Sequence, residues 1–326
     1  MLQTLRTYHY YCMGRKTMQY ILIAIGCLSL HACDIEDERD ICCKRIVMEH
    51  RYTSERQDAF EDNIHSLKHF LFDETERFVK EIAPGKNLQQ QSLDELEAGS
   101  YTMVTLGNVT KTTLPDIPAK GEPLSQFLLQ PAGTDTGNAD PLYYGICRFD
   151  LVDKTARHNQ RFVTYLANVH SKLQVTVKWQ NLPPAMTTAP VYKMTLSHCA
   201  DSYELDGKQG YSLGEKRFPY SASWNREHQL VCALKGLKLK EEFVSLRYTN
   251  SNLPVLHVLC QEGEGYKEIT PALDLKTAFK VWGYKPENSE RQEYKIIVTI
   301  YMDGHVGIKV EAETGVADWI EGGSFG

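Results

Sequence analysis

Short runs of alternating apolar and polar residues are the feature that most constrains the fold of this chain. The clearest run covers Leu173–Trp179, where Leu, Val, Val and Trp share one face and Gln, Thr and Lys share the other. This period of two is typical of a strand in a sheet with one buried face. Similar runs recur at short intervals and no segment carries a sustained helical stripe. The pattern predicts an all-β protein built as a sandwich or barrel.

The expected strands are short and are separated by turn residues. They cover residues 46–52, 64–72, 78–82, 101–106, 143–151, 160–167, 173–179, 191–197, 229–234, 243–248, 255–261, 266–273, 294–302 and 306–310. Asp303-Gly304 between the last two is a strong hairpin signal. Residues 73–77 predict another hairpin turn. We expect a polar connection at 58–63, a loop or one helical turn at 89–98, and a long irregular excursion at 107–140.

The length of the chain indicates more than one domain. Without its first 32 residues, the chain of 326 residues keeps 294, which is long for one domain and comfortable for two. We expect two tandem sandwiches, one over residues 44–169 and one over 170–326. Each would bury one face of each of its sheets, and that area is sufficient for independent folding at ~25 cal/mol per Å² of apolar surface.

The N-terminus predicts a secretion signal. Arg15 and Lys16 precede the apolar run Tyr20–Leu30, which is followed by His31-Ala32-Cys33. A basic segment, an apolar core of roughly ten residues and a small residue describe a cleaved signal. A membrane-spanning helix needs ~20 apolar residues, so this run is too short. We therefore expect residues 1–32 to be a signal peptide that is cut after Ala32.

The cysteine that follows the expected cut predicts lipid attachment. Leu30-x-Ala32-Cys33 resembles the lipobox of bacterial lipoproteins, in which the thiol carries a diacyl group and becomes the first mature residue. An ordinary signal with an incidental cysteine is the alternative. Cys27 is a rival acylation site, but it would leave a short apolar core. Translation starting at Met13 or Met18 instead of Met1 remains open.

The residues after Cys33 are strongly acidic. Asp34, Glu36, Asp37, Glu38 and Asp40 make residues 33–43 a lipidated acidic tether. Loss of the three basic residues of the signal takes the formal net charge from −6 to −9. This balance argues against nucleic acid as a partner, because nucleic acid requires a basic face. The tether also resembles the tag that exports Bacteroidetes lipoproteins to the cell surface, with a solvated spacer as the alternative.

Six cysteines remain after the signal and Cys33 are set aside. They are Cys42, Cys43, Cys147, Cys199, Cys232 and Cys260. In an exported protein they permit up to three disulfides in 15 pairings, and the pairing stays open. The alternative is that several are buried free thiols that pack as small hydrophobic side chains.

No pattern predicts a metal site or a catalytic centre. His65 and His69 would lie ~13 Å apart on a strand, which is too far for one ion. Nucleophile-elbow, P-loop and dinucleotide motifs are missing from the sequence. The acid pairs do not stand out among 42 carboxylates; they are Asp94/Glu95 and Glu241/Glu242. Three aromatic residues are candidates for sugar binding, although such residues more often pack in cores; they are Tyr143, Tyr144 and Trp224. We expect neither a cofactor nor enzymatic activity.

Taken in order, several weak motifs resemble the FimB/Mfa2 family of Bacteroidales fimbrial proteins along nearly the whole mature chain. The matching residues are Cys42/Cys43 before 46–52, Leu71-Phe72-Asp73, Arg77-Phe78-Val79, Leu96-Glu97-Ala98-Gly99-Ser100-Tyr101, Leu106-Gly107-Asn108, Glu293-Tyr294 and Asp318-Trp319. The first hairpin turn lacks the usual glycine of the family, and the cysteines are more numerous than expected.

This resemblance implies a fold and a role. The fold would be two transthyretin-like Greek-key β-sandwiches. The role would be a non-enzymatic lipoprotein that anchors type V pili to the outer membrane, limits their length and lies at the cell surface. It would join the major fimbrial subunit of the same locus by β-strand addition, in which backbone hydrogen bonds supply affinity and alternating side chains supply register. The alternative is a surface lipoprotein that shares the sandwich fold and binds a glycan or host ligand.

Overall fold

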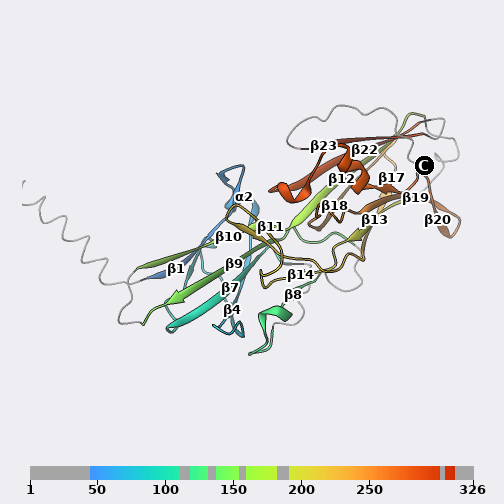
Figure 1. Cartoon of the computed structure of the whole chain (residues 1–326). Coiled ribbons are helices and arrows are strands. Elements are labelled where there is room, and N and C mark those ends of the chain that lie inside the picture. Colours follow the sequence, from blue (N-terminus) through green and yellow to red (C-terminus); the bar gives the residue numbers. More distant parts are fainter. Residues whose placement is uncertain are drawn as a thin grey trace, which may run out of the picture.

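The chain is described by a computed structural model over residues 45–110, 118–130, 137–153, 159–181, 191–301 and 305–312. Strands dominate these residues and the helices are short, which confirms the predicted all-β class (Figure 1). Four sheets of three to five strands carry most of the fold. Two of them lie in the N-terminal half of the chain and two in the C-terminal half.

The N-terminal half packs a three-stranded sheet against a five-stranded sheet. In spatial order, the small sheet contains β10 (Gln160–Tyr165), β1 (Ile46–Arg51) and β6 (Gln90–Ser92). The large sheet contains β11 (Ala167–Asn168), β9 (Tyr143–Leu151), β7 (Gly99–Gly107), β4 (Leu67–Phe72) and β5 (Phe78–Ile82). Ile46 and Met48 of β1 pack against Leu71, Met103 and Phe149 of the large sheet. The alternation in these strands places that set of side chains between the sheets.

The C-terminal half has the same two-layer construction. One sheet contains β18 (Lys238–Leu246), β12 (His170–Trp179), β22 (Gln292–Ile300) and β23 (Val306–Ala312). The other contains β17 (Arg226–Ala233), β13 (Val191–Cys199), β19 (Val255–Glu262) and β20 (Gly265–Glu268), with β21 (Leu273–Asp274) also paired to β19. The core between these two sheets contains the apolar face of the alternating run in β12, with Leu173, Val175, Val177 and Trp179 all buried.

The five-stranded sheet of the N-terminal half is covered on its second face as well. Here Phe70 and Phe72 pack against Phe127 from the irregular excursion and Tyr203 from the C-terminal half. The excursion contains a short 3-10 turn, η1 (Leu124–Gln126), and β8 (Leu128–Leu129). β8 pairs with β14 (Tyr203–Glu204), so chain from beyond residue 200 builds part of the N-terminal core. This pairing crosses residue 170, so the predicted boundary between two domains at that residue stays a prediction.

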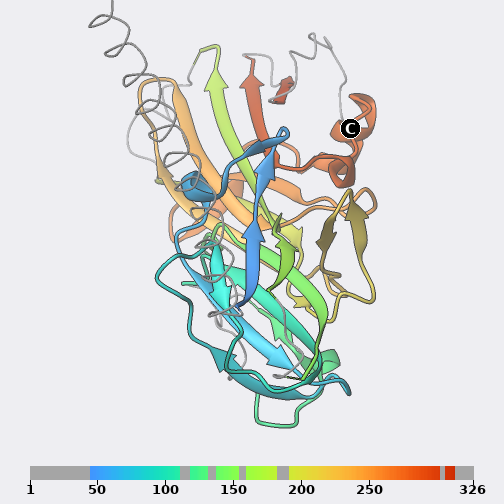
Figure 2. The same cartoon turned by 90° about the vertical axis from the view of Figure 1, so that its left-hand side faces the viewer.

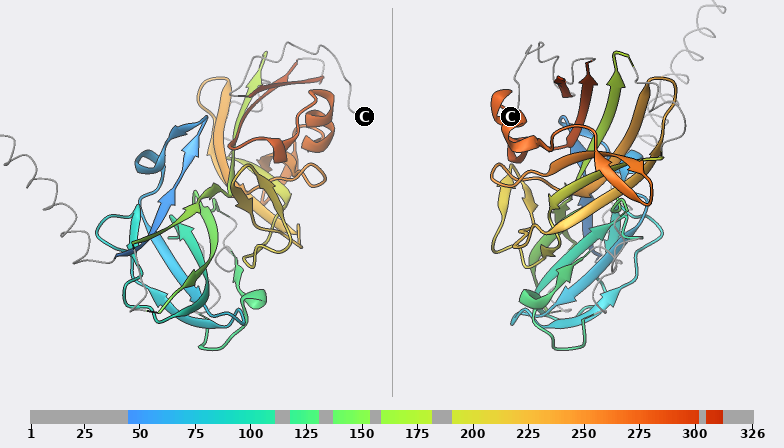
Figure 3. Two further views of the ribbon diagram at one scale, coloured as in Figure 1. Left: turned by 60° about the vertical axis from the view of Figure 1, so that its left-hand side comes forward. Right: turned by 90° about the vertical axis from the view of Figure 1, so that its right-hand side faces the viewer.

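The two halves lie end to end along the long axis of the molecule (Figure 3). β1 runs toward the C-terminal half, as its blue arrow in Figure 2 shows. Its pairing with β10 is parallel and its pairing with β6 is antiparallel.

Several short elements were missing from the sequence prediction. The polar connection at 58–63 contains a helical turn, α2 (Phe60–Asn63), and the loop at 89–98 contains β6. Four more strands are only two or three residues long: β2 (Thr53–Ser54), β3 (Gln57–Asp58), β15 (Tyr211–Leu213) and β16 (Lys216–Phe218). Elements this short carry no full period of alternation, so a sequence pattern does not reveal them.

The expected strand at 266–273 is interrupted, and the helix α3 (Leu275–Val281) follows it. The Asp274 carboxylate caps this helix by accepting the N–H groups of Lys276 and Thr277 at 2.9 and 3.3 Å. Leu275, Ala278 and Phe279 turn toward the C-terminal core. Two helical turns are too short to produce a stripe that a window of 11–18 residues would detect.

Candidate interaction surface

The chain enters the folded body at β1. Cys33, Ala32 and the tether 33–43 lie outside the described residues. The first described residues are held at once: the Arg45 N–H donates to Asn159 Oδ1 at 2.9 Å, and the Ile46 N–H donates to Asp94 Oδ1 at 2.7 Å. A tether attached here leads directly into the central strand of the three-stranded sheet.

A groove separates the two sheets of the N-terminal half on the side where each sheet ends. β5 is the end strand of the large sheet and β6 is the end strand of the small one. The groove has a volume of about 370 Å³ and is lined by Lys80, Glu81, Ile82, Ala83, Gln91, Ser92, Leu93, Glu95 and Leu96. Leu93 and Leu96 are also buried members of the core, and Ile82 packs against it. The groove therefore has an apolar floor that is continuous with the core and a charged rim.

Within the described ranges, backbone partners on the outer side of β5 are found only at its beginning. The Phe78 N–H donates to the Glu122 carbonyl at 2.8 Å, and the Gly121 N–H donates to the Phe78 carbonyl at 2.9 Å. Beyond Phe78 the strand pairs with β4 on one side and borders the groove on the other. An end strand of this kind presents backbone groups that can pair with another chain.

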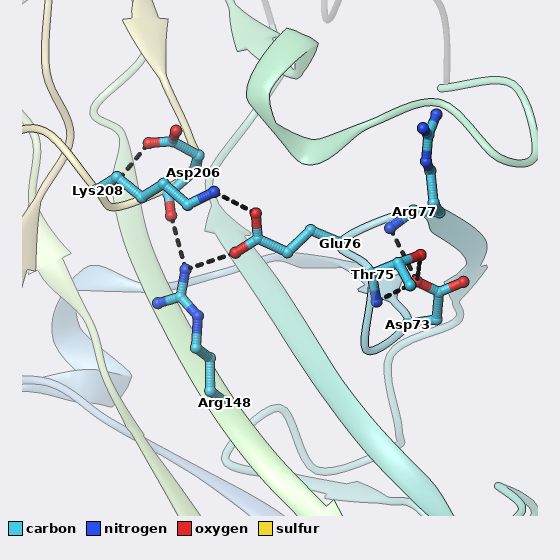
Figure 4. Close-up of polar contacts among 7 residues, drawn as sticks. All are labelled: Asp73, Thr75, Glu76, Arg77, Arg148, Asp206 and Lys208. Carbon is cyan, nitrogen blue, oxygen red and sulfur yellow. Dashed lines mark hydrogen bonds and ion pairs between the residues drawn. The ribbon is translucent and has the colours of Figure 1, made fainter.

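The turn that leads into β5 is held by one ion pair to β9 and one to the C-terminal half (Figure 4). Glu76 accepts a hydrogen bond from Arg148 at 3.2 Å and pairs with Lys208, which follows β14. These cations lower the pKa of Glu76, with the Lys208 hydrogen bond as the largest cause. Asp73 closes the turn by accepting the N–H groups of Thr75 and Arg77 at 2.9 and 3.0 Å.

The predicted hairpin is thus formed without the usual glycine. Glu76 itself takes the left-handed conformation, with φ at 56°. A non-glycine residue in this region is uncommon and carries a steric cost. The ion pairs of Glu76 and the capping by Asp73 offset this cost.

A second, polar cleft lies between the two halves. It has a volume of about 300 Å³ and is lined by Ser54, Glu55, Arg56, Tyr284, Asn288, Ser289, Glu290, Arg291 and Glu293. Beside it, Lys216 Nζ donates to the Thr53 carbonyl at 2.5 Å and pairs with Glu290 at 3.1 Å. The end of β1 is in this way joined to the C-terminal half.

The four cysteines in the described part of the chain are free thiols: Cys147, Cys199, Cys232 and Cys260. Cys232 and Cys260 both stand opposite Tyr192, on the two strands that flank β13. Strands two places apart are separated by roughly 9.5 Å, which is beyond the reach of a disulfide. Cys199 and Cys232 are buried, as the alternative of small hydrophobic packing expected. Cys42 and Cys43 lie outside the described residues.

His65 and His69, which the sequence set too far apart for one ion, differ in their surroundings, and His69 pairs with another histidine. His65 is exposed, whereas His69 is buried and its ring stacks on that of His50 from β1. Among the described residues, no group of three or more His, Cys, Asp or Glu side chains is arranged to hold a metal ion. His50 was missed because the pairing joins two sheets, and nothing in the local pattern marks it.

Among the acid pairs and candidate sugar-binding aromatics, Asp94 has a clear structural role, because its carboxylate accepts the N–H of Ile46 at the start of β1. The Asn138 side chain also contacts Glu242 on β18, at 2.8 Å, but it donates to the backbone carbonyl and not to the carboxylate. Tyr143 and Tyr144 are buried, and Trp224 packs against a core cluster. No helix in the described part of the chain has both the length and the apolar character needed to cross a membrane.

Comparison with known proteins reveals a family match along most of the chain. The model of "Fimbrillin-A associated anchor proteins Mfa1 and Mfa2" matches residues 42–322. No curated protein matches the chain.

Solved structures share the fold at low sequence identity. A candidate adhesin from Bacteroides ovatus superposes with a TM-score of 0.61 at 14% identity, covering 85% of this chain and 95% of that one. A candidate polysaccharide-binding protein from Bacteroides thetaiotaomicron gives 0.60 at 13%, covering 85% and 98%. The fimbrial anchor protein Mfa2 from Porphyromonas gingivalis gives 0.57 at 13%, covering 85% and 99%.

Proposed function

Because the chain belongs to the family of fimbrillin-A associated anchor proteins, we propose that it holds a fimbrium at the outer membrane and limits the length of that fimbrium. Its role is that of a structural fimbrial accessory protein in the cell envelope, not that of an enzyme. The observation that carries the proposal is the family match over residues 42–322, which begins where the acidic tether ends.

The membrane attachment in this proposal is a lipid on Cys33. After cleavage behind Ala32, two or three acyl chains at this residue would hold the protein durably, since each buried methylene contributes about 0.8 kcal/mol. The tether would carry the body away from the lipid headgroups, and the folded part would begin at Arg45. The acidic run supports export to the cell surface. Attachment at the N-terminus favours a place at the base of the fimbrium.

The fimbrial contact in this proposal is β-strand addition in the groove between β5 and β6. An extended segment of the major fimbrial subunit of the same locus would pair with an exposed strand edge there. Its apolar side chains, at every second position, would reach Ile82, Leu93 and Leu96 on the floor. Backbone pairing and alternating pockets are the two elements of this mode of recognition.

A surface lipoprotein that binds a glycan is the second candidate. It is favoured by the structural neighbour from Bacteroides thetaiotaomicron, which is a candidate polysaccharide-binding protein. The polar cleft between the halves offers Tyr284, Arg291 and Glu293, which are side chains of the kind that line sugar sites.

Deletion of the gene in its native host separates the two candidates. We would follow the major fimbrial subunit of the same locus in cell-bound and medium fractions and measure filament length. Long or shed filaments are expected if the protein is an anchor. Filaments of unchanged length that stay on the cells, together with saturable glycan binding by the purified protein, would reject the anchor in favour of the second candidate.

A further inference from the structure

β1 is the first described element of the chain, and it has a neighbouring strand on both sides. Its six residues pair with β10 in parallel register, from Ile46 opposite Gln160 to Arg51 opposite Tyr165. On the other side, Val47 to Glu49 pair with β6. A pull on the N-terminus of the protein therefore reaches a central strand first, not an edge strand.

The two ends of β1 are held by different parts of the molecule. Near its start, Ile46 is bound to Asp94, close to the groove. Just after its end, the Thr53 carbonyl accepts a hydrogen bond from Lys216 of the C-terminal half. Figure 2 shows the strand running toward the C-terminal half along the length of the molecule.

The parallel neighbour carries the chain onward into the C-terminal half. β10 ends at Tyr165, beside the end of β1, and the chain continues through β11 into β12, the inner strand of a C-terminal sheet. Force applied between the N-terminus and the C-terminal half pulls β1 by its first residue and β10 by its last. In a parallel pair these residues are at opposite ends, so the two strands would slide along each other.

We propose that β1 is a force-bearing strand, loaded in shear when the protein is pulled by its N-terminus. In this geometry the ladder hydrogen bonds on both sides must yield together. In an unzipping geometry each bond, with a net strength of about 0.5–1.5 kcal/mol, breaks in turn. A protein of this shape would resist extraction of its first strand while it is tethered to a membrane.

Backbone contacts close both ends of the strand. The Arg45 and Arg51 carbonyls accept the N–H groups of Gln160 and Leu166 at 3.1 and 2.8 Å. On the β6 side, the Leu93 N–H donates to the Ile46 carbonyl at 2.9 Å. If β1 slid by one residue, each of these carbonyls would move away from the N–H group that donates to it, so all of these hydrogen bonds would break together.

Side chains oppose the same movement. Ile46, Met48 and His50 are at most 1% exposed and face the core. A shift by one residue turns every side chain of a strand to the other face. That shift would bring Val47 and Glu49 into the core, and Glu49 would lose its ion pair with Arg161 on β10.

The C-terminal hairpin supplies a contrast inside the same molecule. β23 is an end strand, antiparallel to β22, and Ala312 stands opposite Tyr294. A pull on the C-terminus acts on the Ala312 end of β23 and opens the pairs one after another. We expect this hairpin to open at low force.

The test is single-molecule force spectroscopy on the chain from residue 34 onward, with attachment tags at both ends. The release of β1 is expected at higher force than the opening of the C-terminal hairpin, because shear loads the ladder bonds of β1 together and forced unfolding is governed by the unfolding rate. Release of β1 at or below the force of the hairpin would overturn the proposal. The measurement needs no fimbrial partner, so that result would leave the anchoring role standing.

A disulfide lock identifies the event that belongs to β1. Val47 and Ser92 are directly opposite each other on β1 and β6. The neighbouring residues Ile46 and His50 make the backbone bonds toward β6, so this pair is of the closer, non-hydrogen-bonded kind, at a Cα separation of about 4.5 Å. In oxidised Val47→Cys/Ser92→Cys, residues 47–92 form a closed loop that cannot extend. The high-force event should therefore lengthen the molecule by less than it does in the reduced form. The reduced form is the matched control, and an unchanged high-force event after oxidation would show that β1 does not carry the load.

Discussion

The imidazole ring of His50 on β1 stacks on that of His69 on β4, with the ring centroids 4.7 Å apart and the planes 12° from parallel. Both side chains are buried, and neither ring nitrogen of His50 has a hydrogen-bond partner in the part of the chain that the structure describes. His69 Nδ1 lies 3.2 Å from Thr105 Oγ1. The contact joins the two sheets of the N-terminal half at the strand that follows the tether.

This pair predicts a loss of stability in mild acid. Burial lowers the pKa of His50 to about 3, and the neighbouring ring contributes; burial lowers the pKa of His69 to about 4. The unfolded chain binds protons at a pKa near 6.5, so stability is full above that pH and falls as the pH drops below it. The slope is at most about 1.4 kcal/mol per pH unit for each ring. Urea unfolding at pH 7.5, 6 and 5 measures this slope.

Replacement of His50 by leucine isolates its contribution to that slope. His50→Leu removes two unpaired buried nitrogens, so we expect stability within about 1 kcal/mol of the parent at pH 7.5. Between pH 6 and 5 the slope should become shallower. The control is His65→Leu at an exposed position. An identical slope in parent and His50→Leu would show that His50 does not stay neutral in the fold.

Cys33→Ala is expected to release the protein from membranes. The variant would lose its acyl chains and with them the dominant binding energy of the anchor. Fractionation of cells and labelling with a radioactive or clickable fatty acid measure the change. Cys27→Ala is the matched control and should remain lipid-labelled. A Cys33→Ala protein that is still membrane-bound and labelled would contradict the lipobox interpretation.

Ile82→Lys is expected to abolish binding of the fimbrial subunit without unfolding the protein. Ile82 is half-buried on the floor of the groove, so a lysine can turn its charge to solvent in the free protein. An occupying strand would bury that charge, which costs several kcal/mol. Copurification with the major fimbrial subunit measures the loss. Val231→Lys, at a position that is 67% exposed on the other half, is the control. Equal recovery with both variants would place the contact elsewhere.

Glu76→Gln is expected to cost about 0.5–1 kcal/mol at pH 7, since its partners Arg148 and Lys208 are half-exposed and the ion pairs are screened. The pKa of Glu76 is lowered in the fold, so its contribution is present above the ordinary glutamate pKa and is lost as the pH falls below it. The difference in stability between parent and variant should therefore shrink as the pH falls below the ordinary glutamate pKa. Glu74→Gln, in the same turn and exposed, is the control for urea unfolding. A difference that persists undiminished at pH 3 would assign the effect to the backbone of the turn.

The amino-acid sequence alone was sufficient to predict most of the long strands and the all-β class. The alternation of Leu173–Trp179 is a local property, and each residue of such a run reports which face it occupies. The hairpin around 73–77 was also predicted, although its turn uses Glu76 and not glycine. The signal, Cys33 and the tether are local patterns too, and they stay predictions because they lie outside the described residues.

Tertiary structure decided everything that depends on distant residues. The parallel pairing of β1 with β10 joins residues more than 100 positions apart, and the stacking of His50 on His69 depends on how two sheets face each other. The groove between β5 and β6 exists because two sheets end on the same side. Periodicity states which face of a strand is buried, but it does not state which strand lies beside it. Partners and sheet edges follow from the packing of the whole core, and the contact surface of this protein therefore became visible only in the folded chain.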